Sequence, residues 1–158
     1  MLTIIRGAGD IASGIALRLR RAGIQVVMTE LALPTTIRRT VAFSDAVVKG
    51  KQTVEEVTAR RAENAEEAAR YLAQGILPVL VDPACACREQ LKPEALVDAI
   101  LAKRNLGTVI TDAPIVWAWA RASRRALTVT RWWRPCAGTR WAASFMKAAP
   151  CPTPTFPA

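Results

Sequence analysis

The chain of 158 residues is 51% hydrophobic and 22% charged, which excludes an intrinsically disordered protein and allows one domain with its own core. No apolar run approaches the roughly 20 residues of a membrane span, and the first run ends at Arg6, too early for a signal peptide, so we expect a cytoplasmic protein without membrane contacts. The formal net charge of +9 arises mostly beyond residue 116, because residues 1–116 hold 15 basic and 13 acidic residues, whereas residues 117–158 hold seven basic residues and no acid.

Strand and helix patterns alternate along residues 1–116. Apolar runs bounded by turn residues predict strands, and apolar residues at helical spacing followed by glycine predict helices. Asn64 is the predicted N-cap of one helix, with Glu67 completing a capping box. The predicted strands are Leu2–Ile5, Gln25–Thr29, Ile76–Val81 and Ala95–Leu101, and the predicted helices are Ile11–Ala22 and Ala65–Gln74.

This alternation is typical of βαβ units and predicts an α/β fold, namely a Rossmann-like parallel sheet with flanking helices. The span Thr36–Arg61 is the least regular part. Its apolar residues (Val41, Phe43, Val47 and Val48) suggest extended structure and turns before Gly50, and Thr53–Glu56 has the pattern of a cap on a short helix.

A glycine-rich segment separates the first predicted strand from the first predicted helix. It reads G-x-G-x-x-A, a dinucleotide-binding pattern in which backbone amides and the helix N-terminus receive a pyrophosphate. The candidate cofactor-binding residues in this segment are Gly7, Ala8, Gly9, Asp10, Ile11, Ala12 and Ser13. The alternative is that the glycines serve only a tight turn, and Asp10 opposes phosphate binding unless its carboxylate faces away or caps the helix.

Glu30 ends the second predicted strand, 21 residues after Gly9, where an acid accepts hydrogen bonds from ribose hydroxyls. It favours a free 2′-hydroxyl, as in NAD, whereas Arg38 with Arg39 suits a 2′-phosphate, as in NADP. The alternative for the two arginines is a solvated charged pair. The pattern therefore predicts a nucleotide-type ligand and leaves NAD and NADP open.

Residues with catalytic or metal-binding chemistry are few. The sequence has no histidine and no C-x-x-C pair, so we expect no metal site. Cys85 and Cys87 are either a redox pair or two reduced thiols in a loop. The catalytic candidates are Asp98 with Lys103 (and the nearby Asn105), then Asp112, with Asp82 a further acid at a strand end; the alternative for each acid is a capping or turn role.

Several linked motifs resemble, in order, the selenium-dependent molybdenum hydroxylase accessory family. They are Arg6–Leu19, Met28–Glu30, Pro34–Ser44, Pro78–Pro83, Val97–Thr108 and Thr111–Pro114. The resemblance implies an accessory role in maturing molybdenum-cofactor enzymes of the xanthine-dehydrogenase type. It adds a molybdopterin nucleotide to the possible ligands, and a molybdenum hydroxylase or its maturation proteins to the possible partners. An NAD(P)-dependent oxidoreductase fragment is the first alternative function.

Residues 117–158 differ from that family. They contain all five tryptophans and five of the ten prolines, where the family continues with a glycine-rich stretch. Shifting the reading of the Trp and Ala codons from Trp117 onward yields glycine codons, so we interpret this tail as out-of-frame translation that is poorly ordered and truncates the sheet at its C-terminal side. The gene sequence tests this interpretation. Nucleic-acid binding through the basic tail, with Trp132 and Trp133 as a stacking platform, is a further alternative, which the near-neutral charge of residues 1–116 disfavours.

Overall fold

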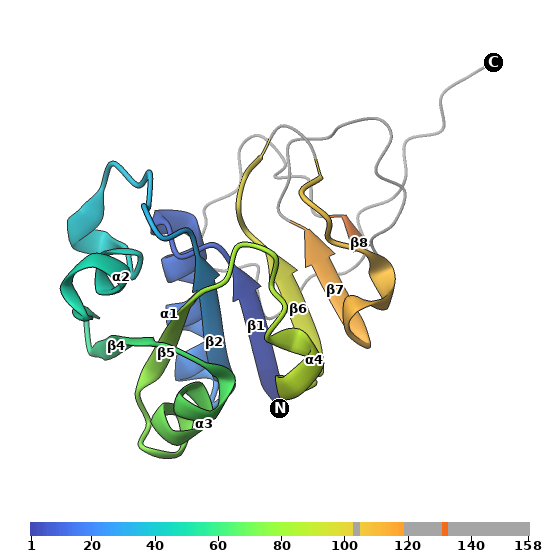
Figure 1. Ribbon diagram of the computed structural model, residues 1–158, viewed down its shortest axis with the longest axis horizontal. Helices are drawn as coiled ribbons and strands as arrows, with labels where there is room; N and C mark the ends of the chain where they lie inside the picture. The colour runs from blue at the N-terminus through green and yellow to red at the C-terminus, as the bar shows by residue number, and fades with distance from the viewer. Residues whose placement is uncertain (103–104, 119–130, 133–158) are drawn as a thin grey trace.

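The computed structural model of the chain describes residues 1–102, 105–118 and 131–132. They form an α/β structure with one sheet in the strand order β3-β4-β5-β2-β1-β6-β7-β8 (Figure 1). The strands are β1 (Leu2–Arg6), β2 (Gln25–Glu30), β3 (Lys51–Val54), β4 (Val57–Ala62), β5 (Leu77–Val81), β6 (Ala95–Asp98), β7 (Ile115–Ala118) and β8 (Arg131–Trp132). The helices are α1 (Asp10–Arg21), α2 (Asp45–Lys49), α3 (Ala65–Ala73) and α4 (Arg88–Leu91), with 3-10 turns at Arg39–Val41 and Ile110–Asp112.

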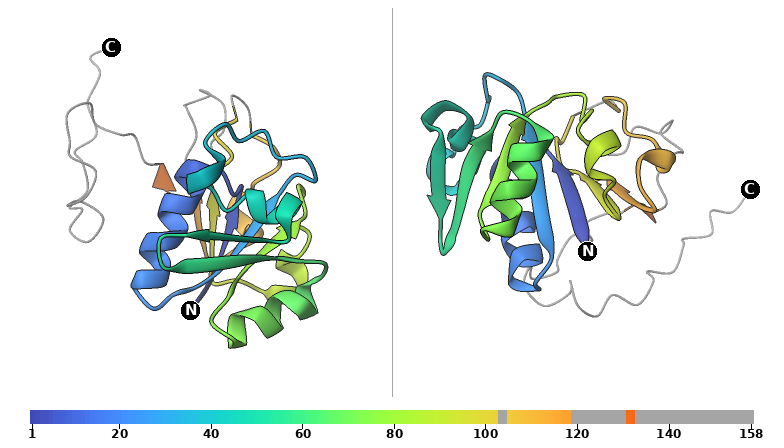
Figure 2. Two further views of the ribbon diagram at one scale, coloured as in Figure 1. Left: turned by 90° about the vertical axis from the view of Figure 1, so that its left-hand side faces the viewer. Right: turned by 60° about the horizontal axis from the view of Figure 1, so that its bottom comes forward.

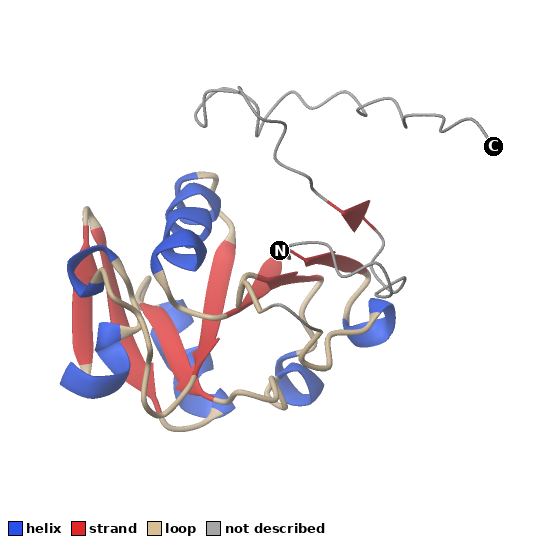
Figure 3. Cartoon of the chain, turned by 90° about the horizontal axis from the view of Figure 1, so that it is seen from above, coloured by secondary structure: helices blue, strands red, loops and turns tan. Residues whose placement is uncertain are grey.

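The sheet is buried on both faces, because side chains alternate between two hydrophobic layers along each central strand. In β1, Ile5 packs with the layer that includes residues of α1 and α2, and Ile4 packs with the layer that includes residues of α3. In β2, Val26 and Met28 join the first layer and Val27 the second. Helices accordingly flank the sheet on both sides when it is seen from above (Figure 3).

The strand order places a topological switch beside β1. The chain passes from β1 through α1 to β2 on one side, whereas β6 pairs with β1 on the other side, and all three strands are parallel. Connections leaving neighbouring strands in opposite directions open a crevice at the carboxyl ends of those strands, where ligands of open α/β sheets bind. The prediction of a Rossmann-like sheet with flanking helices is confirmed, and the sheet is mostly parallel, since β3 and β4 form an antiparallel pair at one edge.

Four predicted strands and both predicted helices are present, with bounds differing by a few residues at their ends. Gly23 follows α1 with φ of 77°, as expected for a left-handed residue after a helix. The Asn64 side chain caps α3 by accepting from Glu67 N at 2.8 Å. A capping box also needs the Glu67 side chain to accept from the amide of the N-cap residue. Glu67 Oε2 instead accepts from Glu63 N, one residue earlier, so the predicted capping box is only half formed.

The expectations for residues 36–61 are wrong in two places. The apolar pattern suggests extended structure around Val47, which instead lies in α2, a single helical turn whose first three residues are buried and which is followed by Gly50 with φ of 79°. Thr53–Glu56 does not cap a helix. It contains the end of β3 and the turn of the antiparallel hairpin β3–β4, with Glu55 in the left-handed region at φ of 51°. This hairpin forms the sheet edge nearest the viewer in the left panel of Figure 2.

Within the described part of the chain, no helix has the length and apolar character needed to cross a membrane. β7 continues two residues past the change of composition at residue 116 and pairs in parallel with β6. The predicted poor order of the tail concerns residues that, apart from 117–118 and 131–132, lie outside those described.

Candidate functional site

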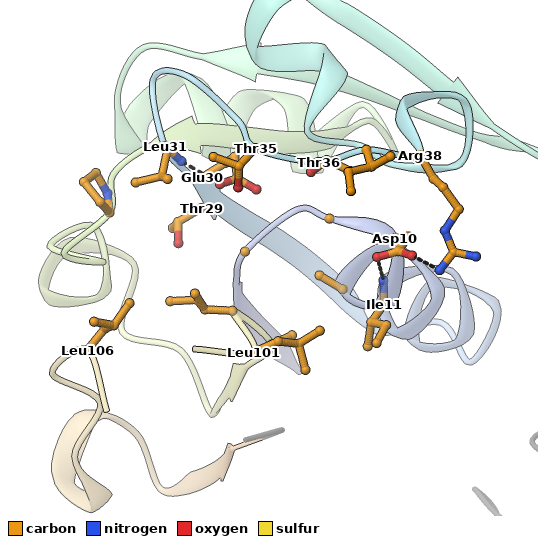
Figure 4. A pocket seen from close by; sticks show the side chains of 17 residues that line it. Asp10, Ile11, Thr29, Glu30, Leu31, Thr35, Thr36, Arg38, Leu101 and Leu106 are labelled. Carbon is orange, nitrogen blue, oxygen red and sulfur yellow. Dashed lines mark hydrogen bonds and ion pairs between the residues drawn. The ribbon is translucent and has the colours of Figure 1, made fainter. Parts of the chain in front are cut away.

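A cavity of about 430 Å³ opens at the carboxyl ends of β1, β2 and β6, where the topological switch places a crevice (Figure 4). One side is formed by the glycine-rich segment and the loop after β2, and the other by the loop after β6. Its lining residues are Gly7, Gly9, Asp10, Ile11, Ala12, Thr29, Glu30, Leu31, Thr35, Thr36, Ile37, Arg38, Pro83, Ala99, Ile100, Leu101 and Leu106.

Gly7 makes the turn from β1 into the glycine-rich segment. Its φ is +95°, which disfavours any L side chain, and its amide donates to Thr29 O at 2.8 Å. A Cβ added at Gly7 would meet Ala99 O at 3.3 Å, a close approach to the loop after β6. Gly7 is therefore needed both for the turn and for the spacing between two walls of the cavity.

Glu30 is held at the end of β2 by two backbone amides. Its Oε2 accepts from Ala8 N and its Oε1 from Leu31 N, both at 2.8 Å. Each carboxylate oxygen has two lone pairs, so each retains one acceptor position after these bonds form. The carboxylate is thus oriented in the cavity wall and still able to accept two hydroxyl donors.

The first turn of α1 supplies backbone donors next to Glu30. Among the described residues, the amides of Gly9, Asp10 and Ala12 have no hydrogen-bond partner, as is usual for the first amides of a helix. Asp10 Oδ1 accepts from Ile11 N at 3.0 Å, and Asp10 Oδ2 pairs with the guanidinium of Arg38 (Figure 4). Asp10 therefore does face the cavity, and its charge is partly offset by Arg38.

The chain is 56% identical over 117 residues to the uncharacterized protein YqeB of Escherichia coli strain K12. That match covers 74% of this chain and 22% of YqeB, so the chain spans about a fifth of the length of this relative. Neither a family model nor a solved structure matches the chain. The name of YqeB states no function.

Most of the predicted cofactor-binding residues lie together at this cavity. The lining includes Gly7, Gly9, Asp10, Ile11, Ala12, Glu30 and Arg38. Ala8 and Ser13 are instead fully buried and outside the lining. The Ser13 hydroxyl donates to Ala8 O at 3.2 Å and accepts from Phe43 N at 2.8 Å, so it fixes the loop before α2 against the glycine-rich segment. Arg39 also lies outside the lining and pairs with Asp45 at 3.6 Å.

The catalytic candidate Asp98 belongs to a buried network and does not line the cavity. Its Oδ2 accepts from the Thr108 hydroxyl at 2.6 Å and lies 3.8 Å from Arg6 Nη1, which also donates to that hydroxyl. Lys103, predicted to act with Asp98, lies outside the described residues. Asn105 Oδ1 accepts from Thr108 N at 2.9 Å and shapes the turn there.

Arg6 is the residue that sequence reasoning missed. Its side chain is 3% exposed, and Nη2 donates to Pro83 O at 2.9 Å and to Leu106 O at 3.1 Å. Both carbonyls belong to cavity-lining residues. A charged residue at the end of a mostly apolar strand, directly before the glycine-rich segment, was the available signal, because arginine is rarely buried without partners.

The two remaining acids, Asp112 and Asp82, are held by local hydrogen bonds and ion pairs outside the cavity lining. Asp112, the second catalytic candidate, pairs with Arg88 Nε at 3.1 Å and accepts from Val109 N at 2.8 Å, outside the cavity lining. Burial raises the pKa of Asp82, but hydrogen bonds from the backbone amides of the following turn, Cys87 first, outweigh it, so that pKa lies below its usual value.

Cys85 and Cys87 are free, buried thiols in the turn between β5 and α4. A hydrogen bond between the two side chains lowers the pKa of Cys85 and, together with burial, raises the pKa of Cys87. Both pack with the apolar layer on the α3 side of the sheet. Among the described residues, no three cysteines, aspartates or glutamates are grouped closely enough to hold a metal ion.

Proposed function

We propose that this domain binds a nucleotide with an unmodified ribose diol, such as NAD. The observation that carries the proposal is the Glu30 carboxylate, which two amides fix at the end of β2 with an acceptor position left on each oxygen. Unpaired amides at the start of α1, in the same cavity lining, supply donors for phosphate oxygens.

The lining also favours NAD over NADP. A 2′-phosphate at the ribose would meet the charge of Glu30, and neither nearby arginine compensates for it. Arg38 pairs with Asp10 at the start of α1, and Arg39 pairs with Asp45 outside the cavity lining. We therefore expect NAD to bind at least tenfold more tightly than NADP.

Binding rather than catalysis is the activity that we propose for the cavity itself. The described lining residues include no lysine, cysteine or tyrosine, and the sequence has no histidine. Both lining carboxylates are already engaged by backbone amides. The oxidoreductase alternative requires a general acid or base, and Asp10 and Glu30, the carboxylates of the described lining, are held by these bonds as hydrogen-bond acceptors.

Titration calorimetry of the whole chain with NAD, NADP and a molybdopterin dinucleotide tests the proposal. Glu30→Gln keeps only one oxygen acceptor, so it should weaken NAD binding tenfold or more, since hydrogen bonds to a charged group contribute about 1.5–3 kcal/mol. Glu66→Gln, an exposed α3 residue outside the cavity lining, is the matched control and should leave binding unchanged. Binding of none of the three ligands, or equal binding to both glutamine variants, would refute the proposal.

The motifs that resemble the selenium-dependent molybdenum hydroxylase accessory family support a wider role, in which nucleotide binding serves maturation of such hydroxylases. Tighter binding of a molybdopterin dinucleotide than of NAD would support this role directly. In a host that makes these enzymes, loss of the gene should lower hydroxylase activity without lowering hydroxylase protein, and the Glu30→Gln gene should fail to restore it.

A further inference from the structure

The cavity carries more negative than positive charge for a site that receives phosphates. Asp10 and Glu30 are its two acids, and Arg38 is the one basic residue among the described lining residues. Glu30 is accounted for by the ribose diol in the proposed function. Asp10 has no such role, and it lies beside the amides that would receive the phosphates.

Asp10 and Arg38 differ in how firmly they are held. Asp10 begins α1, its side chain is 29% exposed, and Oδ1 is bonded to Ile11 N at 3.0 Å. Arg38 lies in the loop after β2, its side chain is 73% exposed, and the Asp10 carboxylate is the only side-chain partner that the described residues give it. An exposed ion pair of this kind contributes little to stability, so Arg38 exchanges partners at small cost.

A ligand phosphate near the start of α1 therefore competes with Asp10 for Arg38, while Asp10 stays in place. A phosphate esterified on both sides carries one negative charge, whereas a terminal phosphate carries about 1.5 to 2 at pH 7. One additional unit charge about 4 Å from a carboxylate in a water-like dielectric weakens binding about fivefold.

We propose that Asp10 is a specificity-determining residue that restricts the cavity to nucleotides whose diphosphate is capped at both ends, such as dinucleotides and nucleotide sugars, and disfavours nucleotides with a terminal phosphate. Arg38 moves from Asp10 to the capped diphosphate on binding. This inference rests on the proposed function, since it takes the same cavity as the nucleotide site.

ADP-ribose and ADP are a suitable pair of probes, because they share adenosine and the diphosphate and differ in whether the terminal phosphate is capped. In magnesium-free calorimetry at low salt, the native chain should bind ADP-ribose about fivefold or more tightly than ADP. In Asp10→Asn the preference should fall to about equal affinity. Asparagine keeps an oxygen to accept from Ile11 N, so this variant removes the charge with little change in the helix start.

Arg38→Gln should weaken the binding of ADP-ribose and of ADP about equally, by about fivefold. Arg39→Gln is the matched control and should leave both affinities unchanged. A native preference that survives in Asp10→Asn would overturn the role of Asp10, and an Arg38→Gln variant with unchanged affinities would overturn the exchange of partners. Either result leaves nucleotide binding intact. A native chain that binds neither probe, and none of NAD, NADP and a molybdopterin dinucleotide, refutes the proposed function itself, and this inference with it.

Discussion

Replacing Arg6 by methionine removes a buried positive charge while keeping most of the apolar stem. The guanidinium is bonded to Pro83 O, Leu106 O and the Thr108 hydroxyl, and lies 3.8 Å from Asp98 Oδ2. After the substitution, the Asp98 carboxylate, 14% exposed, is left without its cation. Breaking a buried pair from one side costs about 3–5 kcal/mol, a large share of the roughly 5–15 kcal/mol by which domains are stable.

Urea unfolding followed by far-UV circular dichroism measures this loss. We expect the midpoint of Arg6→Met to fall by roughly 1–3 M urea. Asp98→Asn in the Arg6→Met background should recover part of the loss, because it removes the uncompensated charge, so the two substitutions should couple by at least about 1 kcal/mol. Arg70→Met, on the exposed face of α3, is the control and should change stability by no more than about 0.5 kcal/mol. A loss below about 1 kcal/mol for Arg6→Met, or strictly additive effects, would show that this network does not stabilise the loops around the cavity.

Three further outcomes are expected. Asn64→Ala removes the side-chain oxygen that accepts from Glu67 N at the start of α3. It should lower the free energy of unfolding, measured by urea denaturation, by about 1 kcal/mol. Gly7→Ala places a side chain at φ of +95° against Ala99 O and should cost about 1–3 kcal/mol and weaken nucleotide binding; unchanged values would mean that the turn relaxes freely. The lowered pKa of Asp82 stabilises the fold above the unfolded-state pKa of about 3.9, and this contribution disappears as the pH falls through the folded-state value. Asp82→Asn should therefore be less stable than the native chain at pH 7, and the difference should shrink below about pH 4.

Elements with local signals could be predicted from the sequence. The α1 helix ends where Gly23 can adopt a left-handed conformation, and α3 begins where Asn64 can accept from an amide three residues on. Both signals need only residues within one helical turn. The alternation of such elements was enough to predict the parallel sheet, and the glycine-rich segment marked where its cavity would lie.

Residues 36–61 could not be predicted because their structure depends on distant partners. Phe43 N donates to the hydroxyl of Ser13, and Ser44 N donates to Ala8 O, both in or beside the glycine-rich segment. These contacts hold a short, partly buried helix, α2, whose apolar residues show no helical period over only five positions. At Thr53–Glu56, a capping pattern and a hairpin turn use the same residue types, and pairing with β4 decides between them.

The catalytic candidates illustrate the same limit at the level of the site. Asp98 ends β6 at the carboxyl edge of the sheet, yet its carboxylate is occupied by Thr108 and Arg6, the latter 92 positions earlier in the chain. An acid at a strand end can face the crevice, or it can hold the adjacent loop through hydrogen bonds and ion pairs. Sequence alone does not separate these roles, because the deciding partner is on another strand.

The acids that do line the cavity share one feature that bears on its chemistry. Glu30 and Asp10 both accept hydrogen bonds from backbone amides of the segments that form the cavity. These bonds fix the positions of both charges before any ligand binds. A fixed carboxylate discriminates between ligands more sharply than a mobile one, since it cannot retreat from an additional negative charge. In the proposed function, the same backbone turn offers amides to a phosphate and holds the acids that would select against extra phosphate charge, and the opposing charges of Asp10 and Arg38 would set how much charge the cavity accepts.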